Sequence, residues 1–376
     1  MSYNNSNIII LGTVTAEELT KVADLYTPTT TALIFPNVVD VLNHLDLVAT
    51  GYSWFTRRQM SHAIVSNFNT IILVDCGGEY IRKAIDWKHP EQNYLQLLRE
   101  LLAAPVKPNR TGVSAHSVFN RELEFPLMLH NEPILPLLTT KRVPLKSVYV
   151  ELLWFLSGAI NTDFLRENGV TIWDKNTSRE YLDSRGLTDY EVGEVGPAYP
   201  YQWRNYGGSG VDQIANLVNG LRDDPYSRRH VVCAWNPVDS AKMALEPCHN
   251  MFTMVVDLPA GSDPRHVLNC KVNMRSTDTF LGLPFNIASY AILTHMIAKI
   301  IGMRPGKVAI SMCDVHLYVN HVEQSKQQIM RSPRDFPKFG FAPHVDAYKS
   351  LDEFVLGDIV VTGYDPHPKL EGAMAV

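Results

Sequence analysis

The segment EPCHN, residues 246–250, combines a thiol with polar neighbours. Cys248 follows a proline and precedes His249, just ahead of an apolar run. A thiolate is a strong nucleophile, and nearby positive charge lowers the pKa of the thiol. An isolated cysteine can also serve as a small buried apolar residue. The polar flanks here favour a nucleophile that faces a cavity.

Arginines in three other segments could supply that positive charge. Arg228 and Arg229 precede the apolar run HVVCAW, Arg110 lies in NRTG, and Arg275 is followed by Ser276. Guanidinium groups bind phosphate through two parallel hydrogen bonds, so this set would suit one dianionic phosphate. The adjacent arginines could instead form a solvated strand edge. Because the chain has a net charge of -5 and a pI near 6.2, an anion site must be a local cluster.

A carboxyl group and an amide stand in otherwise apolar segments. Glu151 is the single acid in LKSVYVELLWFLSGA, where an unpaired carboxylate would be costly. It should be protonated, hydrogen-bonded or functional, and a raised pKa would suit proton transfer. Asn286 precedes a second apolar run and could cap a helix. Its amide also has the donor and acceptor that pair with the N3–H and O4 edge of uracil. His316 and Tyr318 alternate toward one strand face, as partners of sugar hydroxyls would.

Two regions must position these side chains. In residues 1–89, short apolar runs at 7–12 and 71–75 predict buried strands, and 16–26 and 78–87 have helical spacing. We therefore predict a small α/β domain there. It has no G-x-G-x-x-G or G-K-[ST] motif, which favours a packing or partner module over nucleotide binding. Its role does not follow from the residues.

From Pro90 to Val376 the pattern predicts an α+β domain, with a large sheet covered by long helices. The expected segments are helices at 91–102, 145–159 and 287–302 and strands at 113–125, 230–237, 251–258 and 266–274. Residues 159–230 read as a polar, loop-rich insertion.

Other observations exclude classes of protein. The five cysteines are odd in number and lack C-x-x-C spacing, and the histidines form no i, i+4 ligand pair beside an acid. We therefore expect a reducing compartment, no disulfide framework and no metal site. The N-terminus has no signal-peptide pattern, and the apolar runs are too short to cross a bilayer. We expect a soluble cytoplasmic protein that binds neither membrane nor DNA.

The region from Pro90 onward closely resembles the thymidylate synthase superfamily. The matching segments are NRTGV, PLLTTKRVPLKSVYVELLWFLSG, ENGVTIWD, GPAYPYQWR, SRRHVVCAWNP, PCHN, RSTDTFLGLPFNIASY, DVHLYVNH and GYDPHP with a terminal MAV. The resemblance implies a homodimer that transfers a one-carbon unit from the co-substrate 5,10-methylenetetrahydrofolate to C5 of deoxyuridylate (dUMP).

The resemblance also implies a role for each residue. Cys248 would attack C6 of the pyrimidine, and Glu151, with Tyr199 and His249 near its water network, would manage proton transfers. The nucleotide would be held by Arg110, Arg275, Ser276, Asn286, His316 and Tyr318, with Arg228 and Arg229 donated by the opposite subunit. The folate would be bordered by Trp173, Asp278, Gly282 and Val376, with Lys141 on its glutamate tail.

Three departures from the synthase pattern bear on the product. Met274 and Thr253 replace glutamines, and Pro200 replaces a glycine. The phrase VNMRS is similar to that of phage deoxycytidylate hydroxymethylases, but Asn286 suits uracil rather than cytosine. This combination favours a dUMP hydroxymethylase, in which water traps the exocyclic methylene. Phages use such enzymes to make hydroxymethyluracil DNA, and the expected location would then be the cytoplasm of an infected host. The intact LTTKR, ENGVTIWD and MAV favour a thymidylate synthase instead. A catalytically silent nucleotide- or RNA-binding protein is the third alternative.

Overall fold

The computed structural model describes residues 89–374 except 130 and 260–262, together with the backbone of four short strands nearer the N-terminus. The chain divides into two compact units, residues 1–89 and 90–376. In the first unit, β1 (Ile8–Leu11) pairs in parallel with β2 (Ala32–Phe35) and β3 (Thr70–Val74). β4 (Tyr80–Ile81) pairs antiparallel with β3.

The strands of the first unit test the sequence predictions there. β1 and β3 overlap the two predicted runs. The helical spacing at 78–87 is misleading for Tyr80 and Ile81, which form β4, because strand pairing overrides a weak local preference. The predicted helix at 16–26 lies outside the described residues.

The second unit is built on a six-stranded sheet with the order β5-β6-β12-β11-β10-β9. Its strands are β5 (Val106–Lys107), β6 (Ala115–Pro126), β9 (Val231–Cys233), β10 (His249–Asp257), β11 (Val267–Asp278) and β12 (Arg304–Tyr318). β11 and β12 run in parallel and the other neighbours are antiparallel. The predicted strand at 230–237 shortens to β9. Two small two-stranded sheets complete the strands: β7 (Met128–Leu129) with β8 (Glu132–Pro133), and β13 (Lys338–Phe341) with β14 (Ile359–Thr362).

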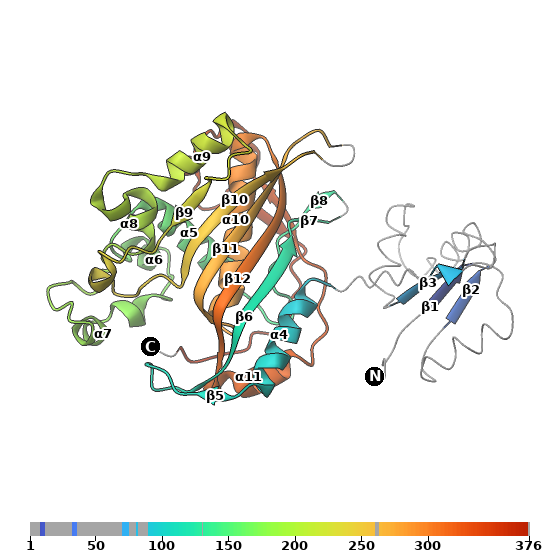
Figure 1. The fold of residues 1–376 in the computed structure, drawn as a ribbon, viewed down its shortest axis with the longest axis horizontal. Coiled ribbons are helices and arrows are strands. Elements are labelled where there is room, and N and C mark those ends of the chain that lie inside the picture. The colour runs from blue at the N-terminus through green and yellow to red at the C-terminus, as the bar shows by residue number, and fades with distance from the viewer. Residues whose placement is uncertain are drawn as a thin grey trace. The chain divides into compact units, whose positions relative to one another are not determined.

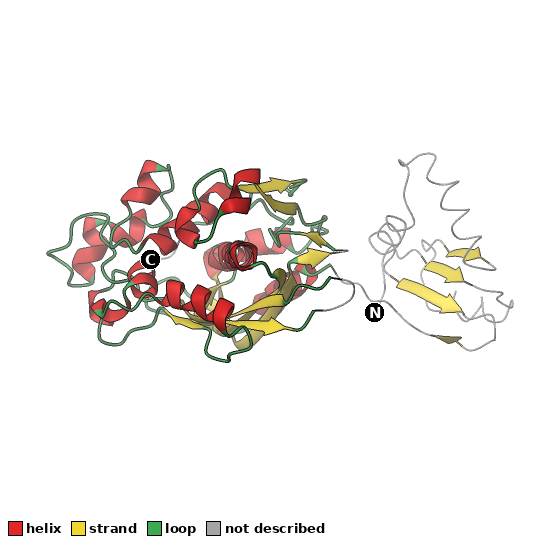
Figure 2. Ribbon diagram, turned by 90° about the horizontal axis from the view of Figure 1, so that it is seen from above, coloured by secondary structure: helices red, strands yellow, loops and turns green. Residues whose placement is uncertain are grey.

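Helices pack alongside this sheet, as the red elements of Figure 2 show. The α-helices are α4 (Glu91–Ala103), α5 (Leu145–Ser157), α6 (Asp163–Glu167), α7 (Arg179–Ser184), α8 (Tyr199–Arg204), α9 (Gln213–Asp223), α10 (Gly282–Ile301) and α11 (Val322–Gln328). The prediction of an α+β domain with long covering helices is confirmed. The 159–230 region predicted as loop-rich contains α6 to α9, all of them short.

Two apolar helices form the centre of the domain. α10 lies behind β11 and β12 in the view of Figure 1, and α5 packs against α10 and α8. Both helices are apolar nearly all round, which is typical of helices buried in a large core. Each ends at a glycine in the left-handed region, Gly158 (φ 77°) and Gly302 (φ 74°), where a side chain would be strained.

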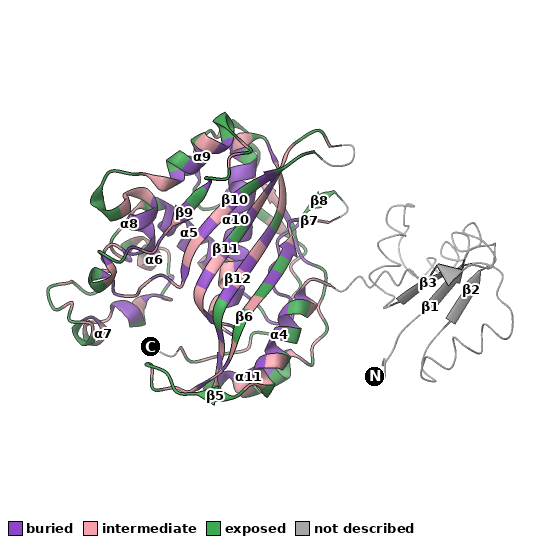
Figure 3. Cartoon of the chain, viewed as in Figure 1, coloured by how far each residue is buried: buried purple, intermediate pink, exposed green. Residues whose placement is uncertain are grey.

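The sheet has one buried face and one open face. Along β10 and β11, residues that pack on the helices alternate with partly exposed residues (Figure 3). The open face carries cross-strand ion pairs, Lys271 with Glu122 (2.7 Å) and Lys307 with Glu124 (2.8 Å). None of the helices in the described part of the chain is long and apolar enough to cross a membrane.

Candidate active site

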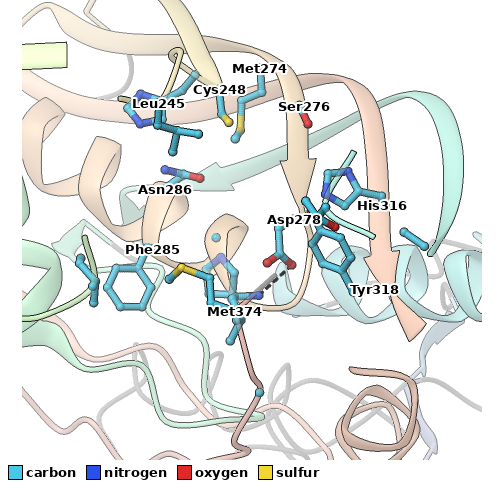
Figure 4. A pocket seen from close by; sticks show the side chains of 18 of the residues that line it. Leu245, Cys248, Met274, Ser276, Asp278, Phe285, Asn286, His316, Tyr318 and Met374 are labelled. Carbon is cyan, nitrogen blue, oxygen red and sulfur yellow. Dashed lines mark hydrogen bonds between the residues drawn. The ribbon is translucent and has the colours of Figure 1, made fainter. Parts of the chain in front are cut away.

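A cavity of about 610 Å³ opens where β10 and β11 meet the N-terminal end of α10 (Figure 4). Its wall also includes parts of α5, the loops 107–111 and 141–144, and the chain near the C-terminus. Of the residues singled out from the sequence, those that line it are Arg110, Lys141, Glu151, Trp173, Tyr199, Cys248, His249, Met274, Arg275, Ser276, Asp278, Gly282, Asn286, His316 and Tyr318. The fold thus collects segments that lie up to 267 positions apart in the chain, from Lys107 to Met374.

Cys248 precedes β10 and is held by its backbone. Its N–H donates to the Tyr199 hydroxyl (2.5 Å), and its carbonyl accepts from the Arg275 N–H (2.9 Å). Burial raises the pKa of the Cys248 thiol, while the charges of Arg275 and Arg110 oppose that rise. The Arg275 Nη2 atom lies 4.0 Å from Sγ. A thiolate formed here would therefore have a cation beside it.

Arg275 cannot easily turn away from the thiol. Its Nε donates to the Pro247 carbonyl and its Nη2 to the Glu246 carbonyl, both at 2.8 Å. The guanidinium also lies over the Trp235 ring, 5.3 Å from the centroid. Two backbone acceptors and one aromatic face fix the direction in which the remaining donors point.

Glu151 projects from α5 toward the same cavity. It accepts a hydrogen bond from Trp173 Nε1 at 2.7 Å. Burial raises the pKa of Glu151 to about 7, although the Trp173 bond acts in the opposite direction. A carboxyl group that titrates near neutral pH can both donate and accept protons, which is the property required of a general acid–base.

Tyr199 and His249 form the part of the cavity wall between Cys248 and Glu151. Their rings stack with centroids 4.1 Å apart, and His249 Nδ1 lies 2.8 Å from the Tyr290 hydroxyl. Burial lowers the pKa of His249 to about 3, so the ring is neutral at physiological pH. The stack therefore offers polar atoms without adding a second charge beside Cys248.

The opposite wall carries groups suited to a base and a sugar. Asn286 lies in the first turns of α10 and points into the cavity below Cys248 in Figure 4. His316 and Tyr318 come from the end of β12, with ring centroids 5.0 Å apart. Ser276 pairs in register with Asp314 one strand away. The alternation predicted for His316 and Tyr318 brings both to the cavity.

The third side of the cavity is formed by Asp278, the turn before α10 and Lys141. Asp278 accepts from the N–H groups of Phe280 (3.0 Å) and Leu281 (3.1 Å), which shapes that turn. The Lys141 Nζ atom donates to the Phe280 carbonyl and lies 3.7 Å from the centroid of the Phe280 ring. Burial lowers the pKa of Lys141 to about 7. The Lys141 side chain is buried, whereas the neighbouring Arg142 is exposed. Contact between Lys141 and the glutamate tail of a folate therefore stays a prediction.

Four of the residues singled out earlier lie elsewhere. Arg228 and Arg229 are exposed in the loop between α9 and β9 and do not line this chain's cavity. Pro200 is buried in the first turn of α8. Thr253 lies on the open face of the sheet, because its neighbours on β10 face the core. Of the two residues that replace glutamines of the synthase pattern, Met274 therefore lines the cavity and Thr253 does not. The predicted folate contact Val376 falls outside the described residues.

Sequence reasoning missed several contributors to the cavity. The chain near the C-terminus supplies Lys369, Leu370, Gly372 and Met374 to the wall. The Ala373 carbonyl there accepts from His321 Nε2 (2.9 Å) and Asn320 Nδ2 (3.2 Å). The only signal of this wall in the sequence was the terminal motif. Within residues 89–374, apart from the short undescribed gaps, no cluster of three acidic, histidine or cysteine side chains could hold a metal ion.

The cavity joins a nucleophilic thiol, a cation beside it and a carboxyl group that titrates near neutrality. Such an arrangement is suited to covalent addition of a thiol to a substrate. The chain belongs to the thymidylate synthase family, because residues 92–376 match the family described as thymidylate synthase.

Individual relatives support the same assignment. The chain is 42% identical to the thymidylate synthase of Saccharomyces cerevisiae over 303 residues, which cover 76% of this chain and 97% of that protein. It is also 42% identical to the Homo sapiens thymidylate synthase over 300 residues, covering 77% of this chain and 91% of the relative. The thymidylate synthase of Herpesvirus ateles is similar to the same degree, with 77% and 99% covered.

Proposed function

We propose that this protein transfers a one-carbon unit from methylenetetrahydrofolate to C5 of dUMP and that its product is thymidylate. The observation that carries the proposal is Cys248 beside Arg275 in a cavity that also holds Glu151 and Asn286. Membership of the family supplies the reaction class, and the similar proteins of yeast and human carry the name thymidylate synthase.

The proposed reaction begins with addition of Cys248 to C6 of the uracil ring. Arg275 stabilises the thiolate through its charge, and the substrate phosphate lies against Arg110, Arg275 and Ser276. Addition at C6 makes C5 electron-rich, so that C5 accepts the one-carbon unit. The folate supplies that unit and, for thymidylate, the hydride that reduces it. Addition of the hydride to the exocyclic methylene restores the C5–C6 double bond and expels the Cys248 thiolate from C6.

Glu151 handles the protons of this sequence. With a pKa of about 7 it is partly protonated at neutral pH, so it can relay protons to the pyrimidine carbonyl and take the C5 proton. Asn286 distinguishes uracil from cytosine, because its amide can accept from N3–H and donate to O4. The neutral His249 and Tyr199 order the solvent between Glu151 and the base.

A second copy of the chain completes the proposed site. Arg228 and Arg229 are exposed and do not line this chain's cavity, as expected of residues offered to another subunit. The open face of the sheet is the surface on which such a homodimer would form. In that arrangement each phosphate receives guanidinium groups from both chains.

One observation favours a second product, 5-hydroxymethyl-dUMP. Met274 lines the cavity beside Cys248, since it pairs in register with His249, and Figure 4 shows it next to the thiol. Its sulfur lies 3.7 Å from the Thr277 hydroxyl, which donates to it. A thioether offers no N–H donor to water or ligand at a position where the synthase pattern has glutamine. The altered wall could change whether hydride or water reaches the exocyclic methylene.

One reaction separates these outcomes. The protein is incubated with dUMP and methylenetetrahydrofolate, and the nucleotide product is weighed by mass spectrometry while dihydrofolate absorbance is followed. Thymidylate together with dihydrofolate supports the proposal. A product heavier by one oxygen, without dihydrofolate, supports the hydroxymethylase. If the protein releases no tritium from C5 of labelled dUMP, the catalytically silent binding protein is the remaining alternative. Cys248→Ala should abolish both reactions, and Arg99→Ala, remote from the cavity, is the control.

A further inference from the structure

Glu91 is a fully buried carboxylate at the start of α4, outside the cavity wall. Its Oε2 atom accepts from the Thr139 N–H (2.9 Å) and hydroxyl (2.6 Å). Its Oε1 atom accepts from the Thr140 N–H (2.7 Å) and hydroxyl (2.5 Å). A carboxylate has about four acceptor positions, and two consecutive residues supply four donors to this one.

The cluster of Glu91, Thr139 and Thr140 depends on the charge and acceptor atoms of the side chain at position 91 as well as on its shape. Burying a carboxylate is costly unless charge-assisted hydrogen bonds replace its hydration. Here Thr139 and Thr140 supply four such bonds, so the carboxylate and that dipeptide hold each other in one arrangement. A glutamine at position 91 would turn an NH₂ group toward donors, leaving at least one buried backbone N–H without its acceptor.

The dipeptide leads directly into the cavity wall. Thr140 precedes Lys141 and Arg142, which both line the cavity, and Lys141 Nζ lies 3.7 Å from the Phe280 ring centroid. Glu91 therefore determines where this loop begins. One helical turn further along α4, the Tyr94 hydroxyl donates to the Thr279 carbonyl (3.0 Å), next to that same phenylalanine.

The same dipeptide anchors the chain near the C-terminus. The Thr139 carbonyl accepts from the His367 N–H (2.7 Å). The Arg331 Nη1 atom donates to both the Thr140 carbonyl (2.7 Å) and the Pro368 carbonyl (2.8 Å). Lys369 follows at once and lines the cavity. Two separate pieces of the wall thus depend on the position of Thr139 and Thr140.

We propose that Glu91 is a positioning residue for the folate side of the site, acting through Thr139 and Thr140 on the loop that carries Lys141 and on the chain near the C-terminus. This inference rests on the proposed function. None of these hydrogen bonds of Glu91, Thr139 and Thr140 goes to the residues assigned to the nucleotide, which are Arg110, Arg275, Ser276, Asn286, His316 and Tyr318. The role is therefore selective for one of the two substrates.

The test compares Glu91→Gln with Glu100→Gln, a matched control on the same helix whose carboxylate faces Arg121 at the surface. For Glu91→Gln we expect the KM for methylenetetrahydrofolate to rise roughly tenfold or more, because a small displacement of a binding loop has effects of this size. The Kd of dUMP alone, measured by calorimetry, should stay within about twofold of the wild-type value. Glu91→Asp keeps the charge and should fall between the two.

Several outcomes would overturn the inference. Equal loss of affinity for both substrates, or a lower Tm with both constants unchanged, would make Glu91 merely structural. If the wild-type protein turns over neither substrate, the proposed function fails on its own, and limited trypsin digestion decides the inference. Release of the loop should speed cleavage after the exposed Arg142 in Glu91→Gln and not in Glu100→Gln. Equal cleavage rates in Glu91→Gln and Glu100→Gln would refute the inference.

Discussion

The Glu151 carboxyl group should make folding stability depend on pH in a predictable direction. Its pKa in the folded protein is about 7, compared with an ordinary value of 4.5. Because each pKa unit corresponds to about 1.36 kcal/mol, ionising this group in the folded protein costs about 3 kcal/mol. Glu151→Gln removes the ionisation and leaves an amide oxygen that can still accept from Trp173 Nε1.

The sign of the effect follows from proton linkage. Below pH 4.5 the carboxyl is protonated in both folded and unfolded chains, and Glu151 costs nothing. As pH rises from 4.5 to about 7, the unfolded chain ionises first and is stabilised relative to the folded one. Stability is therefore lost across this window and the loss is complete above it. Glu151→Gln should gain up to about 3 kcal/mol over wild type at pH 8 and almost nothing at pH 4.5.

Urea denaturation at the two pH values, at one fixed protein concentration, measures this difference. The fixed concentration matters because association of subunits would change apparent stability. Glu100→Gln serves as the control, since hydrogen bonding to Arg121 lowers the pKa of Glu100 and its substitution should bring no gain at high pH. A Glu151→Gln advantage that is the same at both pH values would refute the reasoning. The variant should also lose product formation.

Three further predictions concern the site. Trp173→Phe removes the bond that lowers the Glu151 pKa, so the alkaline limb of the pH–rate profile should move to higher pH; an unmoved limb contradicts this. Arg275→Ala removes a charge that lowers the Cys248 pKa. The pH dependence of the rate at which iodoacetamide alkylates this thiol should therefore shift to higher pH. An unchanged pH profile would dismiss the role of that charge. Asn286→Asp should move substrate preference from dUMP toward deoxycytidylate, measured as the ratio of kcat/KM values, and an unchanged ratio would remove the base-reading argument.

Much of the fold could be predicted because local pattern and burial agree. The apolar runs that become α5 and α10 could only be core helices, and Glu151 stood out since a lone carboxylate among apolar residues has few physical explanations. Prediction was weaker for short segments. Tyr80–Ile81 has helical spacing yet forms β4, since two residues carry too little local preference to resist strand pairing.

The amino-acid sequence by itself indicated the family and most of the side chains that line the cavity, because those depend on residue type and order. Only the tertiary structure separated Met274 from Thr253. Both replace glutamines of the synthase pattern, but successive side chains on a strand point to opposite faces of a sheet, and the register places Met274 in the cavity and Thr253 on the open face. The carboxylate of Glu91 likewise meets Thr139 and Thr140 across 48 and 49 positions of chain. Such long-range meetings follow from packing, which no local pattern encodes.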